Sequence, residues 1–294
     1  MGSLVFILLS WISLATSLAV SGNGKRVAIV GSGNWGSAIA RTVATNVANL
    51  DGYVDEVKMW VYEEEIEGRK LTEIINEDHE NVKYLPGIKL PRTVRACPDL
   101  LDGCADADVL VFVVPHQFLP HVLNDLKGHV KGGAIAVSLI KGLEVGANGP
   151  QLLSSMIQDA LGLPPVAVLM GANVANDVVK DDFVEATLAC RDAHVSQSLK
   201  PIFDSSSFRI QTATDVASVE LCGAVKNVIA MGAGFCDGLN LGTSTKAAIL
   251  RLGLQEMARL CKKFSPDFCM DLMMESCGVG DLIATSFGGR NRRC

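Results

Sequence analysis

Between Lys25 and Thr212, apolar residues gather in short continuous runs, and stretches with helical periodicity separate these runs. Continuous apolar runs are typical of strands that are buried on both faces, as in a parallel sheet. Strands that alternate with helices in this way favour an α/β fold. The predicted strands are Val27–Val30, Val57–Tyr62, Val109–Val114, Ala134–Ile140, Val166–Met170 and Phe208–Thr212.

The pattern changes after Asp215. Val216–Phe235 is largely apolar and rich in alanine and glycine, which predicts a buried helix that its neighbours approach closely. Thr245–Lys262 has the periodicity of an amphipathic helix. We therefore predict two domains, an α/β domain over residues 25–212 and a mostly helical domain over residues 213–294.

The N-terminal residues 1–24 have neither of these patterns. Leu4–Val20 contains no charged residue, and Ala19-Val20-Ser21 resembles a signal-peptide cleavage site, although no Lys or Arg precedes the apolar core. Residues 1–24 are thus interpreted as an apolar leader outside the fold. A secretory or organellar targeting segment is one reading, and a leader without a targeting role is the other.

Composition narrows the classes of partner. The net charge is −6, and the only basic cluster is Arg290–Arg293, which disfavours nucleic acid as a partner. The nine cysteines are scattered and form no C-x-x-C pair, so neither a zinc cluster nor a redox dithiol is indicated, and we expect no metal site. Scattered free thiols suit a reducing compartment such as the cytoplasm.

The first predicted strand is followed by Gly31-Ser32-Gly33-Asn34-Trp35-Gly36 and then by a helical stretch. In the spacing G-x-G-x-x-G, the first glycine permits a tight turn, the second lets the backbone approach a pyrophosphate, and the third lets helix and strand pack closely. The helix N-terminus offers N–H groups to phosphates. This context predicts a dinucleotide site in a Rossmann-like, doubly wound parallel sheet, and a glycine-rich turn without a ligand is the alternative.

The second predicted strand ends at Glu63-Glu64-Glu65. An acidic residue at this point usually binds the ribose hydroxyls of adenosine and repels a 2′-phosphate, which favours NAD over NADP. The alternative is that these acids form the first turn of a helix.

Polar residues follow three later strands, as Pro115-His116-Gln117-Phe118, Lys141-Gly142 and Gly171-Ala172-Asn173. Ligands of open parallel sheets bind outside the carboxyl ends of the strands, so the three segments predict one crevice. Lys141 is well placed to face this crevice, although it could instead be a surface lysine in a turn. His116 could bind there or simply end its strand.

Lys226 lies in the middle of the long apolar helix, next to Asn227 and three residues after Gly223. Burial lowers the pKa of an ammonium group and makes lysine usable as an acid or base near neutral pH. The alternative is that the side chain reaches out to solvent. Asp281 and Thr285 are one turn apart on a predicted helix and share a face, from which the carboxylate could hold Lys226. The alternative is that Asp281 caps its helix and Thr285 is an ordinary hydroxyl.

The segment Gly288-Gly289-Arg290-Asn291 combines a flexible backbone with a guanidinium group. The planar fork of arginine matches phosphate geometry, so the segment is a candidate phosphate-binding loop. A solvated basic terminus is the alternative.

Many ordered motifs resemble the eukaryotic NAD-dependent glycerol-3-phosphate dehydrogenases, from about Lys25 to Arg293. The motifs are GSGNWG at 31–36, HENVKYLPG at 79–87, VVPHQF at 113–118, SLIKG at 138–142, residues 171–175, GAVKN at 223–227, GAGFCDG at 232–238 and GGRN at 288–291.

The resemblance implies reversible hydride transfer between NADH and dihydroxyacetone phosphate, giving sn-glycerol 3-phosphate, by a homodimeric enzyme. It implies that Lys226 is the proton donor and that Lys141 contacts the substrate. Arg290 and Asn291 correspond to residues that bind the phosphate end of the substrate. The polar residues that correspond to the surroundings of the catalytic lysine are Asn227, Asp281 and Thr285.

The resemblance also implies cofactor contacts at Gly31–Gly36, Tyr62, Phe118 and Ala175, with Arg290 near the cofactor as well. Phenylalanine is common at the position of Tyr62, and stacking on adenine should survive this difference. The resembling family lacks the apolar leader and continues well past GGRN, whereas the sequence stops at Cys294, so we expect an incomplete helical domain. The alternatives are a related hydroxyacid or sugar-phosphate dehydrogenase, and a catalytically impaired, truncated isoform that only binds NAD(H).

Overall fold

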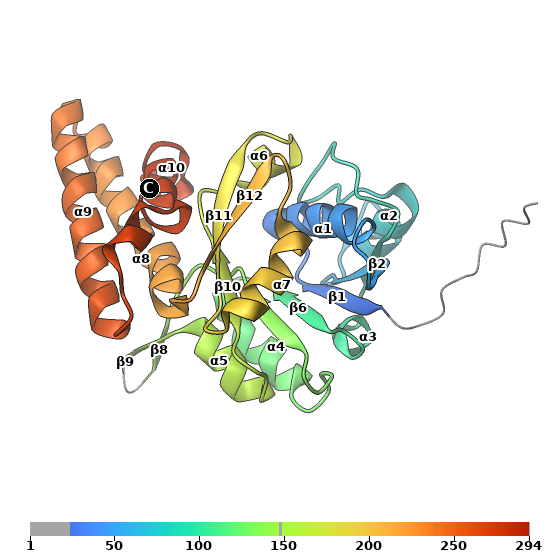
Figure 1. Ribbon diagram of the computed structural model, residues 1–294. Helices are drawn as coiled ribbons and strands as arrows, with labels where there is room; N and C mark the ends of the chain where they lie inside the picture. Colours follow the sequence, from blue (N-terminus) through green and yellow to red (C-terminus); the bar gives the residue numbers. More distant parts are fainter. Residues whose placement is uncertain (1–23, 147–148, 294) are drawn as a thin grey trace, which may run out of the picture.

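The computed structural model describes residues 24–146 and 149–293 and contains an eight-stranded sheet with helices on both faces (Figure 1). The strand order is β12-β11-β10-β7-β6-β1-β2-β5. The strands are β1 Lys25–Val30, β2 Tyr53–Trp60, β5 Val94–Cys97, β6 Val109–Phe112, β7 Ile135–Ser138, β10 Ala167–Met170, β11 Val184–Ala189 and β12 Phe208–Ala213.

Two apolar cores lie on opposite faces of this sheet. One core joins the sheet to α1 and α7, and the other joins it to α4 and α5. The helices of this part are α1 Asn34–Val47, α2 Leu71–Asp78, α3 Leu100–Cys104, α4 Leu119–Leu126, α5 Leu153–Leu161, α6 Ala175–Val179 and α7 Ala193–Phe203. The two short hairpins are β3 Glu65–Ile66 with β4 Arg69–Lys70, and β8 Glu144–Gly146 with β9 Gly149–Gln151.

The strand order reverses at β1, with β2 on one side and β6 on the other. Such a reversal opens a crevice at the carboxyl ends of the strands, and it is where doubly wound sheets bind ligands. The predicted α/β class with a doubly wound parallel sheet is confirmed. One pairing differs, because β11 runs antiparallel to β10.

The sequence pattern did not predict β5 and β11. Charged Arg95 and Glu185 interrupt their apolar runs, and β5 lies at the edge of the sheet. A strand at an edge can expose one face, so it lacks the continuous apolar run that marks the central strands.

The helical part contains α8 Val216–Gly238, α9 Thr243–Phe264 and α10 Asp281–Gly288, with short turns η2 Met270–Met274, η3 Ser276–Gly280 and η4 Arg290–Arg293. Figure 1 shows α8, α9 and α10 side by side next to β10 and β11, and α8 contacts both α9 and β10. Within the described residues, α8 is the one helix long and apolar enough to cross a membrane. Half of its most apolar 18-residue stretch is buried inside the protein.

The predicted long helices are confirmed as α8 and α9, although α8 has exposed apolar side chains at Val228, Met231 and Phe235. The change from sheet to helix falls between β12 and α8, and the division into domains 25–212 and 213–294 stays a prediction. Residues 1–23 of the predicted leader lie outside the described residues.

Candidate active site

The glycine loop between β1 and α1 has the geometry that phosphate binding requires. Gly31 has φ +118°, and a Cβ on Gly36 would collide with the carbonyl oxygen of Gly31. Gly33 is the N-cap of α1 without a side-chain capping bond, and a Cβ there would meet no atom within 4 Å. The first turn of α1 contains no acidic residue, so its N–H groups and the open space beside Gly33 fit a pyrophosphate.

Side chains of the loop are used mainly to hold it in place. Ser32 is buried, and the Asn34 side-chain amide donates to the carbonyl oxygen of Tyr84 at 2.8 Å. The indole of Trp35 packs edge-on against Phe208, with ring centroids 6.4 Å apart. Contacts of Asn34 and Trp35 with the cofactor would therefore come chiefly from the backbone.

Two exposed aromatic rings flank the glycine loop. Tyr62 follows β2 and is 74% exposed, and Phe118 ends η1 (His116–Phe118) after β6 and is 54% exposed. Since β2 and β6 are the two neighbours of β1, these rings lie at the strand ends on either side of the loop. Large exposed aromatic faces at this edge are suited to stacking on the rings of a dinucleotide.

Ala175 begins α6, which packs against α1. Its methyl group is buried in a small cluster with Ala38 and Leu85. Ala175 thus places the start of α6 beside the start of α1, near the predicted cofactor.

Glu63 and Glu64 are already engaged in contacts within the protein. Glu63 accepts from the backbone N–H and the hydroxyl of Thr72 in the first turn of α2. Glu64 pairs with Lys83 and accepts from the hydroxyl of Tyr84, and these contacts lower the pKa of Glu64. Ribose recognition by these acids stays a prediction.

A buried cluster joins the sheet to the helical part. Lys226 of α8 forms an ion pair with Asp281 of α10, and its Nζ donates to Thr285 Oγ1 at 2.6 Å. Lys141, just after β7, donates to the other carboxylate oxygen of Asp281 at 2.8 Å. Asp281 therefore bridges two ammonium groups, and Lys226 and Asp281 are only 5% and 3% exposed.

The surroundings of Lys226 lower its pKa from the usual value to about 7. Burial is the main cause, since it disfavours the charged amine, and the nearby charge of Lys141 acts in the same direction. Asp281 opposes both by stabilising the ammonium form. A lysine in this state can release or accept a proton near neutral pH.

Gly223 explains how the two lysines come together. A Cβ on this residue would lie 2.7 Å from the sulfur of Met170 and 3.6 Å from Cγ of Lys141. A side chain at residue 223 would displace Met170, so glycine lets α8 lie close to β10 and to Lys141 here.

Asn173 lies in one of the three segments predicted to line the crevice, although no individual role was predicted for it, and the structure places it in this cluster. It is 6% exposed, and its Oδ1 lies 3.4 Å from Nζ of Lys141. Its Nδ2 is buried without a hydrogen-bond partner among the described residues. A buried donor without a partner is costly unless a ligand satisfies it. Its position at the end of a predicted strand was the available signal.

Asn227 is partly exposed, and its Nδ2 donates to the carbonyl oxygen of Ala224 at 3.5 Å. No hydrogen bond joins the side chains of Asn227 and Lys226, both of which the structure describes.

Arg290 and Asn291 lie in η4, which packs against α8 and α10. A Cβ on Gly289 would collide with the carbonyl oxygen of Thr285, so Gly289 lets this segment lie close to α10. Phosphate binding by Arg290 and Asn291 stays a prediction.

His116 is exposed, and Gly142 lets its ring approach, because a Cβ on Gly142 would lie 3.3 Å from the ring. The predicted crevice thus brings together the segments of His116, Lys141 and Asn173, and only the last two belong to the polar cluster.

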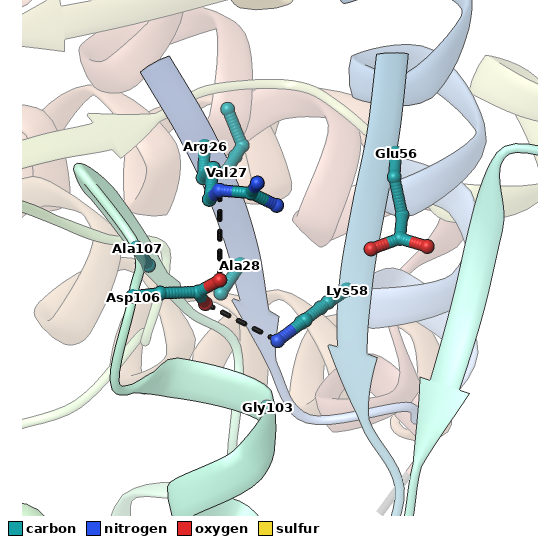
Figure 2. A pocket seen from close by; sticks show the side chains of 8 residues that line it. All are labelled: Arg26, Val27, Ala28, Glu56, Lys58, Gly103, Asp106 and Ala107. Atoms are coloured by element: carbon teal, nitrogen blue, oxygen red, sulfur yellow. Dashed lines mark hydrogen bonds and ion pairs between the residues drawn. The ribbon is translucent and has the colours of Figure 1, made fainter. Parts of the chain in front are cut away.

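A separate hollow lies near the amino end of β1 (Figure 2). Asp106 lies between Arg26 and Lys58 there and pairs with both at 3.5 and 3.2 Å. The charges in this hollow neutralise one another, and it is not part of the crevice. Among residues 24–146 and 149–293, no group of three or more His, Cys, Asp or Glu side chains is arranged to hold a metal ion.

A glycine loop that fits a pyrophosphate and a buried lysine with a lowered pKa are the features expected of a nicotinamide-dependent dehydrogenase. The family models for the N-terminal and C-terminal parts of NAD-dependent glycerol-3-phosphate dehydrogenase match residues 26–196 and 215–294. The chain belongs to the NAD-dependent glycerol-3-phosphate dehydrogenase family, and it is an oxidoreductase that uses NAD.

Individual relatives agree with this assignment. The chain is 54% identical to the cytoplasmic NAD⁺ glycerol-3-phosphate dehydrogenases of Rattus norvegicus and Homo sapiens, over 92% of its length and 77% of theirs. Among solved structures, it resembles glycerol-3-phosphate dehydrogenase of Saccharomyces cerevisiae, with 45% identity, a TM-score of 0.86, and coverage of 92% and 79% of the two chains. The enzyme of Plasmodium falciparum gives 41% identity, a TM-score of 0.88, and coverage of 92% and 75%.

Proposed function

We propose that the chain interconverts dihydroxyacetone phosphate and sn-glycerol 3-phosphate, with Lys226 donating the proton to the carbonyl oxygen during reduction. The observation that carries this proposal is the buried contact of Lys226 with Asp281, together with the pKa of about 7 for Lys226. When bound, NADH supplies the hydride. The product alcohol needs one proton as well, and Lys226 is the buried acid that can provide it.

The other members of the cluster support this step. Asp281 orients both ammonium groups and keeps Lys226 protonated more than burial alone would allow. Lys141 adds a second positive charge, which stabilises negative charge that develops on the carbonyl oxygen. The buried Nδ2 of Asn173 supplies a further donor. Thr285 holds Nζ of Lys226 through its hydroxyl.

We propose that the glycine loop, Tyr62, Phe118 and Ala175 bind NAD, and that Arg290 and Asn291 bind the phosphate of the substrate. The position of η4 against α8 and α10 supports the second assignment, because these two helices carry Lys226 and Asp281. Arg290 would also lie near the cofactor.

A panel of carbonyl substrates tests this function. The purified chain should oxidise NADH fastest with dihydroxyacetone phosphate, more slowly with dihydroxyacetone, and negligibly with 2-keto acids. A higher kcat/KM for a keto acid would reassign the substrate class.

Arg290 gives a sharper test of the phosphate assignment. Arg290→Ala should lower kcat/KM for dihydroxyacetone phosphate about ten- to a hundredfold, because a charged hydrogen bond contributes about 1.5–3 kcal/mol. Arg290→Lys should also be impaired, since lysine keeps the charge but loses the two parallel hydrogen bonds. Steady-state kinetics with dihydroxyacetone, which lacks the phosphate, provides the control. An equal loss with both substrates would show that Arg290 serves the cofactor or the fold.

The lowered pKa of Lys226 predicts opposite pH profiles for the two directions. Reduction requires the ammonium form, so its kcat/KM should fall as the pH rises through about 7. Oxidation requires the neutral amine, so its rate should rise over the same interval. Dihydroxyacetone should show the same profile as its phosphate ester, which separates Lys226 from ionisation of the substrate phosphate. A reduction rate that does not change with pH in this interval would argue against Lys226 as the acid.

We infer a cytoplasmic enzyme, as the names of the rat and human relatives state for those proteins. The cysteines of the described residues are all free, as expected in a reducing compartment. The homodimer implied by the family resemblance stays a prediction, which the solution molar mass would test.

A further inference from the structure

Residues 79–90, here named the clamp segment, form a closed loop after α2 that the chemistry above does not use. Its ends are joined by a hydrogen bond from Leu90 N to the His79 carbonyl at 2.8 Å and by a bridge between Glu80 and Lys89. Between these ends, the segment lies against the glycine loop and the start of α1.

Asn81 makes the central contact between the clamp segment and the glycine loop. Its side chain is fully buried, and Nδ2 donates to the carbonyl oxygen of Ser32 at 2.8 Å and to Oγ of Ser37 at 2.9 Å. The Ser37 hydroxyl in turn donates to the same carbonyl at 3.1 Å. Asn81 thus links the middle of the glycine loop to the first turn of α1.

The acceptor side of Asn81 is fixed as well. Its Oδ1 accepts from the backbone N–H of Tyr84 at 3.1 Å, and the carbonyl of Tyr84 accepts from the side chain of Asn34 at 2.8 Å. The next residue, Leu85, is buried against Ala38 of α1. The amide of Asn81 therefore has one orientation, with both donors directed at the loop and the helix start.

We infer that Asn81 is a positioning residue for the cofactor. Asn81 holds the carbonyl of Ser32 toward the clamp segment. The N–H groups of the glycine loop and of the first turn of α1 are then left free to face the phosphates. A loop with several glycines has many alternative conformations, and fixing one of them before binding lowers the entropy that the cofactor must overcome. Asn81 therefore acts on NADH affinity and not on proton transfer.

Replacing Asn81 with alanine tests this role. NADH titration by fluorescence should show roughly a tenfold rise in the dissociation constant, the effect of losing two buried hydrogen bonds. Hydrogen exchange of the amides of residues 33–37 should become faster. With saturating NADH, kcat should stay within about twofold of the wild-type value, because Asn81 does not contact the Lys226 cluster.

Two more variants refine the test. Asn81→Asp has the same shape but places an acceptor against the Ser32 carbonyl, so it should bind NADH at least as weakly as Asn81→Ala. Ser37→Ala removes the hydroxyl that accepts from Asn81, and the Asn81 bond to the Ser32 carbonyl remains. The NADH affinity of Ser37→Ala should therefore lie between those of the wild-type chain and Asn81→Ala. These variants keep the test decisive if Asn81→Ala folds poorly.

Asn76 offers a matched control in the same region. Its side chain also makes two backbone hydrogen bonds, to O and N of Ala96 at 3.0 and 2.8 Å, but these tie α2 to β5 and not to the glycine loop. Asn76→Ala should lower the melting temperature and leave NADH affinity unchanged. The inference fails if Asn81→Ala binds NADH as wild type does, or if it loses no more affinity than Asn76→Ala. Failure of the wild-type chain to bind NADH would instead contradict the cofactor assignment.

Discussion

Replacing Lys226 with alanine should remove nearly all reduction of dihydroxyacetone phosphate while NADH still binds. A positioned general acid contributes roughly 10²–10⁴ in rate, and losing the charge beside the carbonyl oxygen adds to this effect. The glycine loop that we assign to NADH lies at the end of β1 and does not include Lys226, so the dissociation constant for NADH should change little. Steady-state kinetics and NADH fluorescence titration measure the two effects separately.

Lys58 provides the control for this substitution, because it is also a lysine paired with an aspartate but lies in the hollow near the amino end of β1. Lys58→Ala should leave kcat/KM nearly unchanged. A Lys226→Ala enzyme that stays within about tenfold of wild type would mean that another group supplies the proton, with Lys141 as the first candidate.

Among the substitutions proposed here, removal of the Asp281 carboxylate should lower the free energy of unfolding the most. Asp281→Ala leaves Lys226 and Lys141 without their shared counter-charge, and breaking one partner of a buried ion pair costs up to about 3–5 kcal/mol, which Lys226 lessens by releasing its proton. The pKa of Lys226 should fall further, because Asp281 is the group that raises it. Less of Lys226 is then protonated at neutral pH, so reduction should slow as well.

Chemical denaturation measures the loss, and Asp106→Ala supplies the comparison. Asp106 also bridges two cationic side chains, but its side chain is 46% exposed, so its loss should cost less than about 1 kcal/mol. An equally small effect for Asp281→Ala would contradict the central structural role given to its carboxylate.

Much of the site could be predicted because its signals are local in the sequence. The glycine spacing needs only one strand, one turn and one helix, and Asp281 and Thr285 share a face by helical periodicity alone. Lys226 was identifiable because it is a charge within a long apolar helix. The structure adds that Asp281 joins Lys226 to Lys141, and that Gly223 of α8 lies close to Met170 and Lys141 at this point.

The residues for which no individual role was predicted depend on contacts between distant parts of the chain. Asn173 owes its place in the cluster to Lys141, and Asn81 owes its burial to Ser32 and Ser37. An asparagine in a polar segment gives no periodic signal, so only the fold shows that its amide is buried. In the same way, β5 and β11 were missed because charged residues break their apolar runs.

Transfer of deuterium from NADH to the product is the most direct test of the central claim. The purified chain would be incubated with dihydroxyacetone phosphate and NADH deuterated at the transferred position, and the glycerol 3-phosphate would be analysed by mass spectrometry. We predict one deuterium per product molecule with the wild-type chain, and product at the background level with Lys226→Ala under the same conditions. NADH binding without deuterated product from the wild-type chain would contradict the proposed activity and would favour a protein that only binds the cofactor.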